Sequence, residues 1–423
     1  MKCSVLTEGG RCKQQSLHNG VCSAHQKWQH GRNGQLGFNL IVKNEGAVLE
    51  RCLKNIRLYA DQIVVTDTGS TDDTVAIALR YADRVLFHEW QDSFSESRNF
   101  SLQFSTTEWV CWIDADEMIV PETADKLDNL LRMHGTAKTI FCALLSDLPD
   151  GRCSKHYLPK IFRCRTAHFE GIVHNQLVHD VPVIMSDVAF RHTGYNLDEK
   201  TMKQKRERTA NLLRQQIADD PEDSFALMNL ARTQLGDSDY SESLGTAMRG
   251  LASDKTTGPC REMLLYNQAI CGIHLKDYQM AESACWEGLD LNFENLDLTF
   301  LLAWSSIRSE EWTKAIVYFE RYLILRKTQE TDGFNFLILD FWDAREQALN
   351  YIGVAHRALK NYEAAANAHR RAIALNQSDI IAWKQLALTY QTAKEPEKAR
   401  RVISKIIDLG IADSEVWNEV IAN

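Results

Sequence analysis

The feature that most constrains the fold is a pair of short apolar runs, each of which ends in acidic residues. The runs occupy residues 63–73 (IVVTDTGSTDD) and 109–117 (WVCWIDADE). An apolar run of this length is typical of a parallel strand that is buried on both faces. In open α/β sheets, ligands bind just beyond the carboxyl ends of such strands. We therefore expect Asp67, Asp114 and Asp116 to lie near one another in a cleft.

The acidic pair in the second run has the spacing of a divalent metal site. Asp114 and Asp116 are separated by a single alanine, and carboxylate oxygens suit Mg²⁺ or Mn²⁺ ions that phosphates also hold. The alternative is that turn-forming Asp residues cap two strand ends, as they do in many α/β proteins. The occurrence of both runs in this order favours the metal site.

Four motifs in residues 37–131 resemble those of family-two glycosyltransferases of the GT-A type. They are LIVKNE at 40–45, DTGSTDD at 67–73, FSESRN at 94–99 and WIDADE at 112–117. The resemblance implies a Rossmann-like domain that binds a nucleotide-sugar, usually a UDP-sugar. It also implies a divalent metal ion, Mn²⁺ or Mg²⁺, and a hexosyl transfer with inversion at the anomeric carbon.

The resemblance also implies roles for the side chains at the strand ends. Asn44, Glu45 and Asp67 are expected to contact the nucleoside, and Asp67 to accept hydrogen bonds from uracil or ribose. The alternative role of Asp67 is a turn cap. Asp116 is expected to bind the metal directly, while Asp114 serves the metal and lies nearer the ribose.

Arg98 is a candidate ligand for the donor diphosphate. Its planar guanidinium can hold a diphosphate in bidentate fashion, and the alternative is an ordinary surface ion pair. The surrounding pattern predicts helices over residues 71–81 and 94–104. It predicts strands over 63–66, 84–87, 110–113, 139–145, 158–163 and 183–191.

The proton acceptor is sought in two later segments, 169–175 (FEGIVHN) and 190–195 (FRHTGY). Related transferases with helical-repeat tails have a similar Gly-x-x-His-Glu and a later His-x-Gly-Tyr, but Asn175 replaces the usual Glu here. Glu170 or His174 is therefore expected to act as the base, since burial near a metal tunes either group. His192 is expected to complete the metal shell as a neutral imidazole, and the alternative is a structural histidine.

The first 35 residues carry a different signal. Cys3, Cys12, Cys22 and His25 meet the four-ligand demand of structural zinc, and a segment this short needs metal to fold. The pattern is similar to small zinc modules attached to phage and nucleic-acid-associated proteins. The segment is also locally basic, so nucleic acid is a candidate partner; the alternative is a disordered leader with incidental thiols.

A 34-residue period begins after about residue 200 and indicates tetratricopeptide repeats. Gly353 and Ala387 are 34 residues apart, as are Ala365 and Ala399. Weaker copies begin near residues 224, 262 and 295. An insert at 331–343 contains Phe334, Phe336, Phe341 and Trp342, and we expect it to pack against the transferase domain because exposed apolar patches need a partner.

The predicted fold class is therefore α/β plus all-α. A zinc segment over residues 1–35 precedes a GT-A (Rossmann-like) nucleotide-sugar-binding domain over 36–198. A tetratricopeptide α-solenoid over 199–423 follows, with a concave surface that suits a polymeric acceptor or a partner protein.

Composition narrows the setting. The net charge of −9 gives no general attraction for nucleic acid or anionic membranes. The chain has no apolar run of 18 residues and no apolar signal segment near its start, so we expect a cytoplasmic protein without a transmembrane segment. Its cysteines are then mostly reduced, and several fit buried positions in apolar patterns.

The main functional hypothesis is a metal-dependent, inverting glycosyltransferase that acts on a hydroxyl or other nucleophile of a saccharide, protein or peptide. One alternative is a phage-type glycosyltransferase acting on modified bases in DNA. Another is a catalytically silent scaffold. The retention of Asp67, Arg98, Asp114 and Asp116 favours the enzyme.

Overall fold

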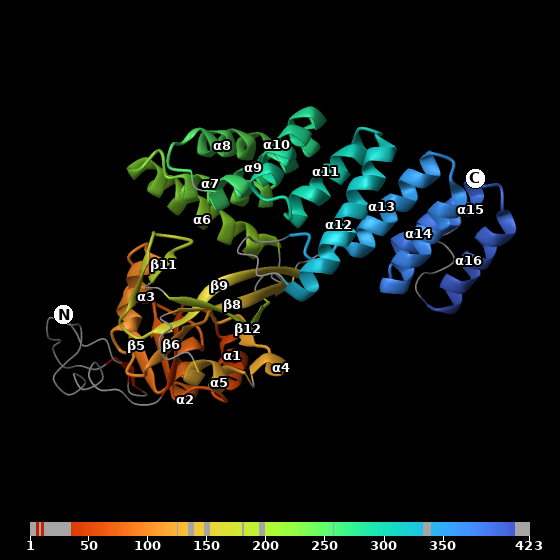
Figure 1. Ribbon diagram of the computed structural model, residues 1–423. Helices are drawn as coiled ribbons and strands as arrows, with labels where there is room; N and C mark the ends of the chain where they lie inside the picture. Colours follow the sequence, from red (N-terminus) through yellow and green to blue (C-terminus); the bar gives the residue numbers. More distant parts are fainter. Residues whose placement is uncertain are drawn as a thin grey trace. The chain divides into compact units, whose positions relative to one another are not determined.

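The computed structural model describes residues 6–7, 10–11, 35–124, 126–133, 139–147, 153–179, 182–193, 199–256, 258–332 and 340–410. The chain divides after Pro221 into two compact units (Figure 1). The helix α6 (Glu199–Asp219), which the sequence analysis placed in the repeat tail, belongs to the first unit.

The first unit is built on a mixed sheet whose described strands follow the order β5-β4-β3-β6-β9-β8-β12-β7. Strands β3, β4, β5 and β6 are parallel, β9 is antiparallel to both β6 and β8, and β12 runs parallel to β8 but antiparallel to β7. The strands are β3 (Leu36–Val42), β4 (Gln62–Asp67), β5 (Arg84–Phe87), β6 (Trp109–Trp112), β7 (Glu117–Ile119), β8 (Thr139–Asp147), β9 (Cys153–Arg163) and β12 (Val183–His192). Two hairpins lie apart from this sheet: β1 (Leu6–Thr7) with β2 (Gly10–Arg11), and β10 (Ala167–Glu170) with β11 (Gln176–His179).

Successive side chains of the parallel strands point to opposite faces of the sheet, and both faces are buried. In β6, Trp109 and Cys111 join the main core, whereas Val110 and Trp112 join a second cluster with Phe162. The main core also receives apolar side chains of α1 (Leu49–Ile56), α2 (Thr74–Tyr81), α4 (Pro121–Ala124) and α5 (Leu127–Met133). The second cluster is packed against Leu102 of α3 (Phe94–Leu102). The predicted buried parallel strands are therefore confirmed.

The predicted elements of the first unit are present, with shifted helix boundaries. Helix α2 begins at Thr74 and not at residue 71, because the Asp72 carboxylate accepts the Thr74 N–H at 3.0 Å and closes a turn there. Helix α3 ends at Leu102. Its start is capped by the Ser93 hydroxyl, which accepts the Glu96 N–H, as expected for a helix N-terminus.

The second unit consists of helices packed in consecutive pairs (Figure 1). They are α7 (Ser224–Gly236), α8 (Tyr240–Ala252), α9 (Gly258–Leu275), α10 (Tyr278–Leu291), α11 (Leu296–Arg308), α12 (Trp312–Asp332), α13 (Arg345–Ala358), α14 (Tyr362–Leu375), α15 (Ile380–Thr392) and α16 (Pro396–Asp408). Pairs begin close to residues 224, 262 and 295, where weaker repeats were expected. The predicted tetratricopeptide-type architecture is confirmed.

The described end of the insert before α13 contacts helices of the second unit. The Phe341 ring stacks on Phe300 of α11 with centroids 4.1 Å apart, and the Arg326 guanidinium of α12 lies 4.0 Å from the Trp342 ring centre. Both aromatic side chains thus pack within the second unit, while Phe334 and Phe336 lie outside the described residues. The expectation that Phe341 and Trp342 pack against the transferase domain is not supported by these contacts.

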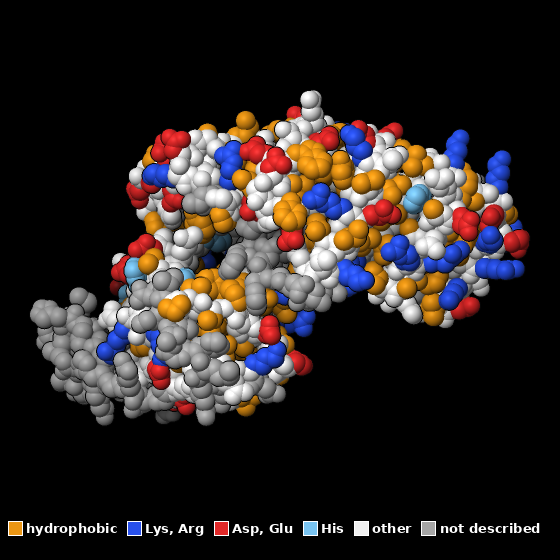
Figure 2. Space-filling model, in the orientation of Figure 1, with side chains coloured by type: hydrophobic (Ala, Val, Ile, Leu, Met, Phe, Trp, Pro, Cys, Tyr) orange, Lys and Arg blue, Asp and Glu red, His pale blue; other side chains and the backbone are white. Residues whose placement is uncertain are grey.

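Apolar side chains are exposed on the helices of the second unit (Figure 2). Phe293, Val317 and Ile324 are 67%, 55% and 64% exposed, and Trp286 makes an edge contact with Tyr318. Exposed apolar groups that gather on one surface mark interaction sites more often than isolated ones do. None of the described helices has both the length and the apolar character needed to cross a membrane.

Candidate functional site

The strand order brings the predicted site residues to one edge of the sheet. Val42, the last residue of β3, lies opposite Asp67, the last residue of β4, and β6 runs parallel on the other side of β3. Asn44 and Glu45 therefore leave β3 at the edge where β4 ends and where Asp114 follows β6.

Asp67 caps the turn that follows β4. Its side chain is buried, and Oδ2 accepts the Gly69 N–H at 3.0 Å. Both carboxylate oxygens also accept the Ser70 N–H, at 3.1 and 3.2 Å. Gly69 has a φ of +112°, which side chains disfavour. The contacts match the turn-cap alternative, and the nucleoside contact of Asp67 stays a prediction.

Asn44 and Glu45 tie the end of β3 to the loop between β4 and α2. The Asn44 side-chain oxygen accepts the Thr71 N–H at 2.8 Å, and the Glu45 N–H donates to the Thr74 hydroxyl at 2.8 Å. Asn44 itself has a φ of +57°, a conformation that Asn tolerates better than most residues. The two predicted nucleoside ligands thus sit on a rigid, cross-linked loop.

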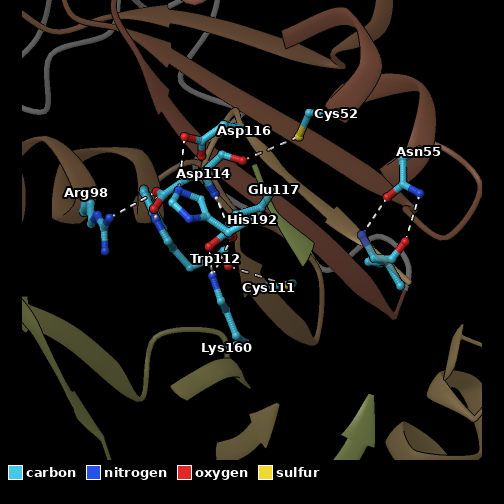
Figure 3. A network of polar contacts seen from close by, with 11 residues as sticks. Cys52, Asn55, Arg98, Cys111, Trp112, Asp114, Asp116, Glu117, Lys160 and His192 are labelled. Carbon is cyan, nitrogen blue, oxygen red and sulfur yellow. Dashed lines mark hydrogen bonds and ion pairs between the residues drawn. The ribbon is translucent and has the colours of Figure 1, made fainter. Parts of the chain in front are cut away.

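Asp114 is held from two sides at this edge (Figure 3). Its Oδ1 accepts hydrogen bonds from Arg98 Nη2 at 3.1 Å and from the Trp112 indole N–H at 3.4 Å. Burial alone would raise the pKa of Asp114, but the positive charges of Arg98 and Lys160 outweigh it and hold that pKa below its ordinary value. The lowered pKa keeps Asp114 ionised. Its side chain is 45% exposed, so the carboxylate is open to a ligand.

Glu45 shares the electrostatic environment of the acidic pair. Partial burial raises the pKa of Glu45, and the negative charges of Asp116 and Asp114 raise it further, although Lys205 of α6 opposes the change. The structure therefore groups the ends of β3 and β6 as the sequence predicted.

Asp116 and His192 face each other across the site. Asp116 Oδ2 lies 3.1 Å from His192 Nε2, and both side chains are 19% exposed. Strand β12 carries His192 and is fixed beside the acidic turn, because the Thr193 N–H donates to the Asp116 carbonyl at 3.1 Å. Burial lowers the pKa of His192, but the hydrogen bond and negative charge of Asp116 outweigh it and raise the pKa above its ordinary value.

A buried ion pair beneath the acidic turn was missed by the sequence analysis. Lys160 Nζ lies 2.8 and 2.5 Å from the two carboxylate oxygens of Glu117, and their side chains are only 6% and 2% exposed. Glu117 Oε2 also accepts the Asp114 N–H at 3.1 Å. The pair thus supports the turn from below (Figure 3). The available signal was Lys160 between the apolar residues Leu158 and Ile161 of a predicted strand, because a buried lysine requires a partner.

Arg98 forms an ion pair with Asp114, as the alternative interpretation expected, but its side chain is mostly buried against two aromatic rings. Its guanidinium carbon lies 4.8 Å from the Trp112 ring centre and 5.1 Å from that of Phe169, and its side chain is 16% exposed. Asn99 fixes Phe169 by exchanging two hydrogen bonds of 2.8 Å with its backbone. The contact of Arg98 with the donor diphosphate stays a prediction.

The two candidate bases lie on the β10–β11 hairpin next to α3. The Phe94 N–H, at the start of α3, donates to the Ile172 carbonyl at 2.9 Å and anchors the hairpin turn. Glu170 is exposed and Oε1 lies 3.0 Å from His168 Nε2. His174 is exposed, with a φ of +48°. Both side chains are exposed, so the burial that was expected to tune the base is absent, and the choice between them as base stays a prediction.

The predicted metal ligands Asp114, Asp116 and His192 do not form a complete metal site by themselves. Across the described residues, no three or more His, Cys, Asp or Glu side chains are arranged to hold a metal ion by themselves. Mg²⁺ and similar ions are commonly bound by one or two carboxylates together with substrate phosphates. Asp116 and His192 lie 3.1 Å apart, and their binding of a metal ion together with Asp114 stays a prediction. The proposed zinc ligands Cys3, Cys12, Cys22 and His25 lie outside the described residues.

Comparison with known proteins finds a family model and several similar proteins. Residues 40–186 match the model of glycosyl transferase family 2. A TPR repeat-containing protein of Synechococcus elongatus is 28% identical over 56% of this chain and 61% of its own length. The SPbeta prophage-derived glycosyltransferase SunS of Bacillus subtilis is 29% identical over 43% of this chain and 45% of its own length.

Two further matches cover 38% and 47% of this chain. An uncharacterized glycosyltransferase of Rickettsia felis is 27% identical over 38% of this chain and 58% of its own length. The chain thus spans about half the length of the curated relatives it matches. The solved structure of YrrB, a TPR protein, covers 47% of this chain and 92% of its own, with 18% identity and a TM-score of 0.36.

Proposed function

Because residues 40–186 form a domain of glycosyl transferase family 2, we propose that this protein transfers a sugar from a nucleotide-sugar to a nucleophile of an acceptor. The observation that carries the proposal is the set of polar side chains at the shared carboxyl edge of β3, β4 and β6, where Asp116 meets His192 at 3.1 Å. The donor is a UDP-sugar, and transfer inverts the anomeric carbon.

The nucleoside of the donor is assigned to the cross-linked loops after β3 and β4. Asn44 and Glu45 are held there by Thr71 and Thr74, so they are positioned before the donor arrives. Asp67 accepts the backbone N–H groups of Gly69 and Ser70, and a carboxylate has about four acceptor sites in all. Capacity therefore remains for a ribose hydroxyl or a base N–H.

The diphosphate is assigned to the acidic turn and Arg98. Asp116 and His192, with Asp114 beside them, would hold Mn²⁺ or Mg²⁺, and the bound ion supplies neutralising charge for the leaving diphosphate. Arg98 lies against Trp112 and Phe169, which keeps its guanidinium in a fixed orientation near Asp114. A preoriented cation of this kind stabilises developing negative charge without reorganising.

The role of general base, which removes the proton of the acceptor hydroxyl, is assigned to Glu170 or His174 on the hairpin that α3 anchors. Either group can remove a proton from an acceptor hydroxyl that is brought within hydrogen-bond reach. The repeat unit, with exposed apolar side chains such as Phe293 and Ile324, is assigned to a polymeric acceptor or a partner protein.

The first experiment is donor hydrolysis across a panel of nucleotide-sugars with Mn²⁺ and with a chelator. We expect metal-dependent release of the nucleotide diphosphate from one donor, because water can replace the acceptor. The Asp187→Ala variant is a control, since Asp187 is 66% exposed in a surface ion pair with Lys126. Absence of binding and hydrolysis with every donor would favour a catalytically silent scaffold.

A structural zinc site in residues 1–35 is a separate proposal, supported by the spacing of Cys3, Cys12, Cys22 and His25. Elemental analysis of the purified protein should find zinc, and the Cys12→Ser/Cys22→Ser variant should lose it. Donor hydrolysis should survive this change, because the donor motifs lie after residue 36. Unchanged zinc content in the variant would rule out this site.

A further inference from the structure

A groove with a volume of about 460 Å³ lies in the first unit beside the loop after β5. Asp92 of that loop forms one wall. The other wall is one face of α6, which contributes Gln204, Glu207, Arg208, Asn211, Leu212 and Gln215. The polar members of this wall are exposed, whereas Leu212 is buried.

The α6 wall is a continuous stripe. Its residues recur every three or four positions from 204 to 215, so they lie on one face of the helix over about 16 Å. The opposite face carries Ala210, Leu213 and Ile217, all of which are buried. Helix α6 is therefore held by apolar packing while it turns a row of amide and charged groups to the groove.

The groove adjoins the proposed donor site. The Arg208 guanidinium lies 5.6 Å from the ring centre of Phe94, the first residue of α3. Arg98 lies on the same helix four residues later, about one turn or 6 Å along the axis, and contacts Asp114 at 3.1 Å. A ligand in the groove would thus sit next to a ligand at the acidic turn.

The chemistry of the lining selects the kind of ligand. Two carboxylates, Asp92 and Glu207, face one cation, Arg208, so the groove lacks the excess positive charge that a diphosphate needs. Side-chain amides such as Asn211 offer both donors and acceptors, which matches neighbouring hydroxyl groups. At the wall, Trp90 donates to Asp92 at 2.8 Å and makes an edge contact with Phe94 at 4.8 Å.

We propose that this groove binds a neutral saccharide segment of the acceptor beside the donor site. The inference rests on the proposed function, since it names the acceptor class for the same reaction. Planar amides and carboxylates would bind the sugar hydroxyls, and the row along α6 is long enough for more than one ring. A lining that combines amide and charged side chains with the apolar Leu212 fits both the hydroxyl groups and the apolar ring faces of a sugar.

The test is saturation-transfer NMR with the full chain and a panel of neutral probes: N-acetylglucosamine, maltose, lactose and cellobiose, with a Ser/Thr-rich peptide for comparison. Asn211→Leu removes a central amide and places a good helix former there. Lys203→Leu is the matched control, because Lys203 is exposed on α6 but does not line the groove. UDP binding with Mn²⁺ is measured separately for each protein.

We expect at least one saccharide to bind the wild type, at least a tenfold loss of its affinity in Asn211→Leu, and no change in Lys203→Leu. UDP affinity should be the same in all three proteins. Lack of saccharide binding, equal binding by Asn211→Leu, or binding of the peptide in place of the saccharide would overturn the inference. Failure of the wild type to bind any nucleotide would instead overturn the proposed function. Nucleotide binding and saccharide binding are measured separately, so the two failures can be distinguished.

Discussion

At the scale of single residues, the site depends on which charges are buried and which face solvent. The Lys160–Glu117 pair is almost fully buried, whereas Asp114 is 45% exposed. Glu117 receives the Asp114 N–H, so the buried pair fixes the backbone from which the exposed carboxylate projects. The exposed carboxylate that can contact a ligand and the buried pair that positions it are therefore different residues.

The Lys160→Met change should strongly destabilise the first unit. It leaves Glu117 buried without its cation, and removing one partner of a buried pair costs about 3–5 kcal/mol. Adding Glu117→Gln should restore more than half of the loss, because the buried charge is then gone and an oxygen still accepts the Asp114 N–H. Urea unfolding measures each free energy.

The matched control for Lys160 is Lys126→Met. Lys126 and Asp187 are 61% and 66% exposed in their ion pair, and such pairs contribute about 0–1 kcal/mol. If Lys160→Met cost no more than Lys126→Met, the buried pair would not support the turn as described.

The Asp116→Ala change should abolish most of the proposed donor hydrolysis while sparing the fold. Loss of one charge-stabilising contact typically lowers the rate about 10²- to 10³-fold. The pKa of His192 should also fall in the variant, since Asp116 raises it in the wild type. Hydrolysis assays, thermal melting and histidine NMR check the three parts. Near-normal hydrolysis with the metal present would remove Asp116 from the metal shell.

At the scale of elements, the repeat unit depends on close helix approach and on a recurrent turn. Each turn within a helix pair contains a non-glycine residue with φ between +61° and +65°: Ser238, Lys276, Glu310, Lys360 and Lys394. The next residue donates its N–H back to a carbonyl five positions earlier in each case, as Asn361 does to His356 at 2.8 Å. This is the bonding of a left-handed helix C-cap, and it explains why the pairs share one geometry.

Gly353→Ala should destabilise the repeat unit. An added Cβ at Gly353 would lie 2.3 to 2.7 Å from ring atoms of His369, and that ring is fully buried. Overpacking of this kind costs about 1–3 kcal/mol. Thermal or urea unfolding of the repeat unit measures the change.

Gly245→Ala is the matched control for Gly353. Gly245 lies in α8, and an added Cβ there would meet no atom within 4 Å. Alanine should therefore stabilise the helix by about 0.5–1 kcal/mol. Equal effects of the two substitutions would contradict the close approach of α13 and α14 at Gly353.

The stability of the repeat unit should fall as the pH drops below about 6.5 because of His369. Burial lowers the pKa of His369 from 6.5 to about 3, and its Nδ1–H donates to the Asn350 side-chain oxygen at 3.2 Å. The unfolded chain binds a proton between these two values and the folded chain does not. The free energy of unfolding therefore keeps its full value above pH 6.5. Between pH 6.5 and pH 3 it falls by about 1.4 kcal/mol per pH unit.

The His369→Gln variant isolates this contribution. It keeps a side-chain donor for Asn350 but does not titrate, so it should lose stability at pH 7 yet decline less steeply between pH 7 and 5. Urea unfolding of both proteins over this range gives the difference. Parallel curves would show that His369 carries no pH dependence.

At the scale of the whole molecule, two units with separate cores share one chain. The sheet core includes Phe38, Leu40 and Trp109, and a core of the repeats includes Trp383 and Leu386. A ligand that binds one unit stabilises that unit by mass action. The unit that binds a given ligand can therefore be identified by the unfolding transition whose temperature the ligand raises.

UDP with Mn²⁺ should raise the unfolding transition of the first unit and leave that of the repeats in place. At a ligand concentration of about 100 Kd, the added stability is about 2.7 kcal/mol. Differential scanning calorimetry of the full chain measures both transitions, and Asp116→Ala should reduce the shift. A shift of the repeat transition by UDP would contradict the assignment of the donor to the first unit.

The sequence alone determined the features that depend on local pattern. Apolar runs of strand length gave β4, β5 and β6, and the 34-residue period gave the paired helices, because burial imposes its periodicity on the residues themselves. The same strand ends located Asp114 and Asp116, since parallel neighbours bring their carboxyl ends to one edge.

Only the tertiary structure decided which groups meet across the sheet. Lys160 and Glu117 are 43 residues apart and pair although they lie on β9 and β7, which are not neighbours in the sheet. His192 reaches Asp116 because β12 runs beside β7. The place of α6 was also undetermined, because its amide stripe and apolar face resemble those of any repeat helix. These contacts are set by strand order and packing, and a local pattern carries no information on either.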